Sequence, residues 1–123
     1  MIATISWWNL TESTQTIESL RQYLNDEGVA PWEAIQGMRS KFWMSDPDKN
    51  LWGAVVVWNS PEFLTQPLPP NRATELIGYP PTWRTTFDVE VLIDQGVIVS
   101  TAMHSPPPNS QPIAVDNHLE NAL

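Results

Sequence analysis

The sequence predicts an α+β domain in which strands and helices follow one another in the order β-α-β-β-α-β. Four segments are rich in β-branched and aromatic residues with alternating apolar positions, which is typical of strands. Two segments between them carry capping residues and the spacing of amphipathic helices. The length of 123 residues, 41% of them hydrophobic, fits one domain with its own core.

The first half of the chain contains three of the predicted strands and the longer predicted helix. Ile17, Leu20 and Leu24 recur at intervals of three and four, which predicts a helix that ends near Gly28. A turn with the sequence DPDKN separates two alternating segments and predicts a hairpin. The predicted strands lie at residues 3–8, 36–45 and 52–59.

The second half begins with a helix start at Ser60-Pro61, where a capping residue precedes a proline. Prolines 67, 69 and 70 interrupt this helix, and a second short helix over residues 72–77 is expected to end at Gly78. Alternation over residues 85–93 predicts the fourth strand, and residues 96–103 are a further β candidate.

The composition changes at Pro106. The last 18 residues contain four prolines and no aromatic or basic residue, which predicts a disordered tail. We therefore expect a domain over residues 1–105 and a tail over residues 106–123.

The predicted order matches the ferredoxin-like fold, a four-stranded antiparallel sheet with its helices on one face and strand order 4-1-3-2. If residues 47–50 form the hairpin loop, the numbers of paired residues sum to 97. Trp43 then lies opposite Ala54, and Arg39 lies opposite Trp58.

This register separates two faces of the sheet. Phe42 and Val55 are expected to face the helices, together with Ile5, Phe87, Val89 and Val91. The other face would turn away from the helices and carry three tryptophans, an exposed patch that a second copy of the chain is expected to cover. The residues of that face are Ser6, Trp8, Arg39, Lys41, Trp43, Trp58, Asp88 and Glu90.

The segments GMRSKFWMSDPDKNLWGAVVVW and ELIGYPPTWRTTFDV resemble the YdhR-like monooxygenases of the dimeric α/β-barrel superfamily. The resemblance covers roughly residues 3–93. It implies a homodimer in which two sheets face each other and enclose a cavity. Relatives in that superfamily include cofactor-independent quinone-forming monooxygenases, haem-degrading enzymes, isomerases and proteins of no known activity.

Candidate site residues come from the tryptophan-bearing face. Arg39, Asp88 and Glu90 are the catalytic candidates, because a carboxylate pair performs acid–base chemistry when buried and a guanidinium stabilises an anion. The alternative is that they face solvent or pair across a dimer. The ligand-binding candidates are Ser6, Trp8, Lys41, Trp43 and Trp58, whose indoles and cation suit a flat aromatic molecule. The alternative for the indoles is a filled dimer core.

Charge and composition argue against several functions. A net charge of −8 disfavours nucleic acid and anionic membranes as partners. There is no cysteine and there are only two histidines, so we expect no metal site and no cofactor. The lack of cysteine, of a signal peptide and of a long apolar run predicts a cytoplasmic protein.

Three functions stay open at this point. The first is a cofactor-independent monooxygenase or isomerase that acts on a hydrophobic or aromatic small molecule. The second is a non-catalytic barrel that binds such a molecule or merely stabilises a partner. The third is a structural module whose proline-rich tail recruits another protein.

Overall fold

The structure is a computed structural model that describes residues 1–68 and 72–100. The described chain falls into two compact units, one formed by residues 2–87 and the other by Met1 with residues 88–100. The predicted boundary at residue 105 and the predicted tail over residues 106–123 lie outside the described residues. No helix in the described ranges is long and apolar enough to cross a bilayer.

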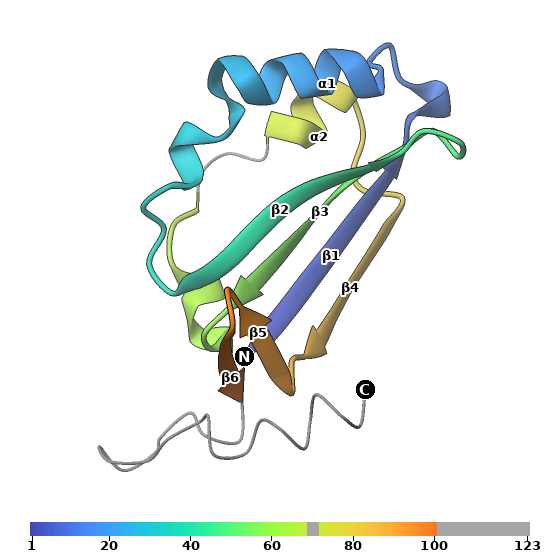
Figure 1. The fold of residues 1–123 in the computed structure, drawn as a ribbon. Coiled ribbons are helices and arrows are strands. Elements are labelled where there is room, and N and C mark those ends of the chain that lie inside the picture. Colours follow the sequence, from blue (N-terminus) through green and yellow to red (C-terminus); the bar gives the residue numbers. More distant parts are fainter. Residues whose placement is uncertain (69–71, 101–123) are drawn as a thin grey trace, which may run out of the picture. The chain divides into compact units, whose positions relative to one another are not determined.

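The larger unit is a four-stranded antiparallel sheet with helices on one face (Figure 1). The strand order is β2-β3-β1-β4, which is the predicted order read from the other edge. The arrangement is compatible with a ferredoxin-like fold. The strands are β1 (Ile2–Asn9), β2 (Met38–Asp46), β3 (Leu51–Trp58) and β4 (Trp83–Asp88).

Two α-helices, α1 (Ile17–Tyr23) and α2 (Arg72–Ile77), lie over the same face of the sheet. Helix α1 begins with a capping box: the Thr16 hydroxyl accepts from the Ser19 amide at 3.0 Å, and the Ser19 hydroxyl accepts from the Thr16 amide at 2.8 Å. The chain also forms four short helical turns, η1 (Leu10–Glu12), η2 (Leu24–Gly28), η3 (Ala30–Trp32) and η4 (Pro61–Thr65).

The predicted hairpin register is confirmed from Ser40 to Asp46, whose partners run from Val57 to Leu51. The prediction is wrong at the next residue. Met38, and not Arg39, pairs with Trp58, because a β-bulge leaves Arg39 as the extra residue of β2. A bulge interrupts the alternation of side chains along a strand. The face of the sheet on which Arg39 lies therefore cannot be derived from the alternation of β2.

The assignment of the two sheet faces is wrong. Trp8 and Trp52 belong to the buried core cluster with Leu20 and Ile77, and Trp43 packs against it. The tryptophan-bearing face therefore lies against the helices. Phe42, expected in the helix-facing core, is 50% exposed. The strand register determines which side chains share a face of the sheet. It does not determine which of the two faces the helices cover.

The smaller unit contains a two-stranded hairpin of β5 (Val91–Asp94) and β6 (Val97–Ser100). Gln95 and Gly96 form its turn with φ values of 51° and 78°, as a type I′ hairpin turn requires. The strand predicted over residues 85–93 is thus two strands, with the break after Asp88. Val89 and Val91, expected in the helix-facing core, belong to this unit.

Candidate ligand-binding cavity

A cavity of about 500 Å³ lies within the larger unit, between the helix layer and the sheet. Its floor comes from the sheet, where successive rows of paired residues point to the same side. One row is Lys41, Val56 and Thr4, and the next is Trp43, Ala54 and Ser6. The residues of β3 and β1 in these rows are small, so the middle of the floor is low and open space is left above it.

Aromatic side chains surround this low floor. Five of the seven tryptophans of the chain line the cavity, namely Trp8, Trp32, Trp43, Trp52 and Trp58. Trp58 and Trp8 are only 2% and 4% exposed. The indole N–H of Trp8 donates to the carbonyl oxygen of Tyr79 at 3.0 Å, which fixes the orientation of this ring.

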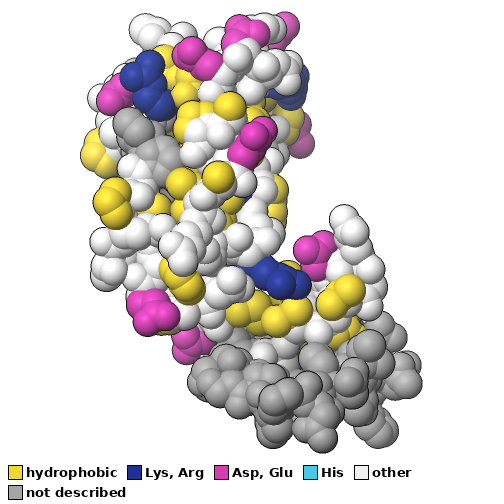
Figure 2. Space-filling model, turned by 90° about the vertical axis from the view of Figure 1, so that its left-hand side faces the viewer, with side chains coloured by type: hydrophobic (Ala, Val, Ile, Leu, Met, Phe, Trp, Pro, Cys, Tyr) yellow, Lys and Arg dark blue, Asp and Glu magenta, His cyan; other side chains and the backbone are white. Residues whose placement is uncertain are grey.

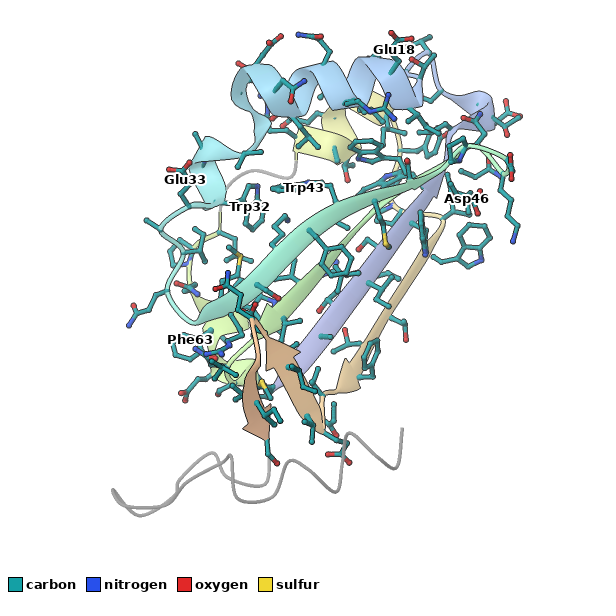
Figure 3. All side chains as sticks on the ribbon, viewed as in Figure 1. Glu18, Trp32, Glu33, Trp43, Asp46 and Phe63 are labelled. Atoms are coloured by element: carbon teal, nitrogen blue, oxygen red, sulfur yellow. The ribbon has the colours of Figure 1, made fainter. Side chains whose placement is uncertain are left out.

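The helix layer supplies the roof. Leu20, Tyr23, Leu24 and Gly28 come from α1 and η2, and Ala73 and Leu76 come from α2. Trp32 of η3 and Trp43 of β2 lie in the space between the helices and the sheet (Figure 3). Hydrophobic side chains also reach the surface on the side that carries η3 and η4 (Figure 2). Leu64 and Leu68 line the cavity and are 36% and 39% exposed.

The loop that holds Trp32 is fixed by a close contact. Gly37 has a φ of 77°, and a Cβ atom at this position would lie 2.1 Å from the ring of Phe63. The absence of a side chain therefore lets the Phe63 ring pack on the backbone. Gln66 closes the same region, because its side-chain amide donates to the carbonyl oxygens of Gln36 and Phe63 at 2.6 and 2.8 Å.

Lys41 is the one charged side chain that β2 places in this cavity. Its Nζ atom lies 3.5 Å from the ring centre of Trp32 and 5.0 Å from that of Trp43. Desolvation lowers the pKa of Lys41 from 10.5 to about 8. The two indole faces favour the charged form, but burial away from water has the larger effect.

The remaining charged groups of the cavity wall are Glu27 of η2, Arg72 of α2 and Arg84 of β4. Arg72 donates to the carboxylate of Glu75 at 3.0 Å. Within residues 1–68 and 72–100, the pair of Arg72 with Glu75 is the only ion pair. Neither Lys41 nor Arg84 has an acidic partner in these residues.

The structure brings together the five predicted ligand-binding residues. Ser6, Trp8, Lys41, Trp43 and Trp58 all line the cavity. The sequence predicts them on the sheet face away from the helices. In the structure they instead lie on the face that the helices of the same chain cover. Sequence reasoning missed Trp32 and Trp52: Trp32 stands in a loop without periodicity, and Trp52 was read only as part of a strand.

The predicted catalytic residues are placed differently. Arg39 is not among the residues that line the cavity, and its Nε atom is buried without a hydrogen-bond partner in the described part of the chain. Asp88 and Glu90 are exposed, belong to the smaller unit and are not among the lining residues. The arrangement of one arginine beside a carboxylate pair is therefore not present in this cavity.

The described residues contain no group of three or more histidine, cysteine or acidic side chains able to hold a metal ion. In comparisons with known proteins, no protein-family model matches the chain and no curated protein matches it.

Proposed function

We propose that the chain binds a hydrophobic or aromatic small molecule in the cavity between its helices and its sheet. The observation that carries the proposal is the cavity of about 500 Å³ with five tryptophans in its wall. Small-molecule sites in proteins have volumes of roughly 300–1,000 Å³ and mostly apolar walls with a few polar groups. This cavity has both properties.

The physical alternative, that the indoles merely fill a core, fits the geometry less well. Protein interiors are packed as densely as organic crystals, and unfilled apolar space destabilises the folded state. Ala54, Ser6 and Thr4 keep the middle of the floor low while large rings stand around it. Larger side chains at these positions would fill the space, so the present ones suit a site that has to stay open.

We further propose the ferredoxin-like topology, membership of the YdhR-like group and a homodimer. The tryptophans no longer motivate the dimer, but the sheet face away from the cavity supports it. Phe42 pairs with Val55 on that face and is 50% exposed. Trp83 and Phe87, which alternate with the cavity residue Arg84 along β4, are 53% and 46% exposed. These exposed side chains lie on the two edge strands of that face, whereas Val55 between them is buried. Exposed apolar side chains of this size are typical of interaction surfaces. A cytoplasmic location stays part of the proposal.

Catalysis is the second candidate, and Lys41 favours it. An amine with a pKa of about 8 in an apolar cavity is mostly protonated at pH 7, but its smaller neutral fraction can accept a proton from an acidic group of a bound molecule. An isomerase or a cofactor-independent monooxygenase begins with such a proton transfer. Binding is proposed first, because the described residues of the cavity wall include one carboxylate, Glu27, and no pair for acid–base chemistry.

Replacement of Ala54 tests the binding proposal. Ala54→Leu adds three carbon atoms to the middle of the cavity floor and should abolish binding of the neutral fluorescent probe N-phenyl-1-naphthylamine. Thr85→Leu is the control, since Thr85 is an exposed residue next to Arg84 on the opposite face of β4. The wild type and the control should bind the probe equally. Failure of the wild type to bind it, or equal binding by Ala54→Leu, would contradict the proposal.

A further inference from the structure

We infer that the ligand of the cavity carries an anionic oxygen group, such as an aromatic carboxylate or phenolate, and that Lys41 holds this group. The inference rests on the proposed function and specifies the chemistry of its ligand.

The charge of the cavity is opposite to that of the chain. The sequence has 6 basic and 14 acidic residues, which gives a net charge of −8. Three of the basic residues line the cavity, namely Lys41, Arg72 and Arg84, against one acidic residue, Glu27. Because Arg72 is paired with Glu75, the positive groups of the wall without an acidic partner in the described residues are Lys41 and Arg84. A low-dielectric cleft in which one sign of charge predominates attracts ligands of the other sign. An acidic chain that places half of its basic groups around one cavity therefore suits an anion.

Lys41 also lacks the partner that a buried cation usually has. Arg72 is paired with Glu75, whereas Lys41 has no acidic partner among the described residues. The indole faces of Trp32 and Trp43 cover two sides of its ammonium group. An ammonium group has three N–H donors, and indole faces are weak acceptors compared with a carboxylate. An oxygen anion from a ligand would supply the missing strong acceptor.

The position of Lys41 fits an amphiphilic ligand. The row of Lys41, Val56 and Thr4 lies next to the row of Trp43, Ala54 and Ser6. An anionic group bound at Lys41 leaves the low part of the floor over Ala54 and Ser6 for the apolar body. The indoles around that part then contact the rings of the ligand. A cationic ligand would instead meet Lys41 without an intervening acidic group.

Matched pairs of ligands separate charge from shape. The affinities of benzoate, 2-naphthoate and 9-anthracenecarboxylate are measured at pH 7 by tryptophan fluorescence and calorimetry. Each carboxylate is compared with the neutral alcohol in which CH2OH replaces the carboxylate. The best-fitting carboxylate should bind at least tenfold more tightly than its alcohol, because a charge-assisted hydrogen bond contributes about tenfold to a hundredfold in affinity.

Variants assign the effect to one residue. Lys41→Met should remove the tenfold or greater preference for the carboxylate and change the affinity for the alcohol by less than about threefold, while Lys41→Arg should keep part of the preference. Lys49→Met is the matched control, because Lys49 is the other lysine of the chain and is exposed in the hairpin turn. Thermal melts of each variant confirm that it is folded.

The pH dependence provides a second readout that does not depend on a substitution. Carboxylate affinity should fall as the pH rises through about 8, where Lys41 loses its proton, and the alcohol should bind equally across this range. Glu27, Tyr23, Arg72 and Arg84 also line the cavity, so the same series on Lys41→Met measures their contribution.

The inference is overturned if no carboxylate of the series binds more tightly than its alcohol, or if Lys41→Met keeps the preference. In both cases binding of the neutral probe still stands, and the proposed function survives. If neither the probe nor any member of the series binds, the proposed function and the inference fail together.

Discussion

Replacement of Lys41 by methionine should make the protein more stable at pH 7. The fold lowers the pKa of Lys41 from 10.5 to about 8. One unit of pKa corresponds to about 1.4 kcal/mol, so the full shift sets an upper limit of ~3 kcal/mol. Partial contact with water and the two indole faces reduce this penalty, which leaves an expected gain of about 1–2 kcal/mol. Methionine keeps the apolar length of the side chain and removes the charge.

The sign of the pH dependence follows from the same shift. Below pH 8 Lys41 is protonated in both states, and the penalty on the folded state is complete. Between pH 8 and 10.5 the unfolded chain binds more protons than the folded one, so the stability of the wild type should rise with pH in this window. Lys41→Met should lack this contribution, and its advantage over the wild type should shrink toward pH 10.

Urea unfolding followed by tryptophan fluorescence at pH 7, 8, 9 and 10 measures both effects. Wild type and variant differ only at position 41, so the difference between the two proteins reports on Lys41. Lys49→Met should follow the wild type at every pH. A variant that is less stable than the wild type at pH 7, or a difference that does not change between pH 8 and 10, would refute the reasoning.

Three further predictions concern the fold and its surface. Gly37→Ala should lower the free energy of unfolding in urea by about 2 kcal/mol or more, because the new Cβ atom would clash with the Phe63 ring. Gly78→Ala is the control: Gly78 also has a positive φ but no atom near its Cβ position, so this change should cost about 1 kcal/mol. Tyr79→Phe should cost about 1–2 kcal/mol in the same assay, because a backbone carbonyl of β1 loses the hydroxyl that donates to it. Sedimentation should show a dimer for the wild type and a monomer for Phe42→Lys, and a wild type that is monomeric at high micromolar concentration would contradict the dimer.

Local sequence signals predicted much of the fold of the larger unit. The predicted helix over residues 72–77 has the bounds of α2, and Gly78 ends it with a φ of 102°. Capping residues, turn residues and positive-φ glycines act within a few residues, so a sequence shows them directly. The break after Asp88 was not visible, because alternation continues through it and no glycine or proline marks it.

The wrong assignment of the two sheet faces shows what local sequence signals cannot predict. Alternation identified which side chains share a face, and the set of Ser6, Trp8, Lys41 and Trp43 is correct. Which face the helices cover depends on total buried area, and here they cover the face with the indoles, each of which buries a large apolar surface. The β-bulge at Arg39 was equally invisible, since it inserts one residue without changing the composition of the strand.

The position of the cavity changes how binding and assembly relate to each other. A site between two sheets needs both subunits, so loss of the dimer would abolish binding. The cavity observed here is lined by residues of a single chain, from Thr4 to Arg84, and its sheet residues point away from the exposed Phe42. The two faces of one sheet thus carry two separate surfaces, and a monomeric Phe42→Lys variant should bind the neutral probe with the affinity of the wild type. Loss of binding in that monomer would mean that the second subunit contributes to the cavity. It would support the alternative in which the ligand binds between the sheets of two subunits.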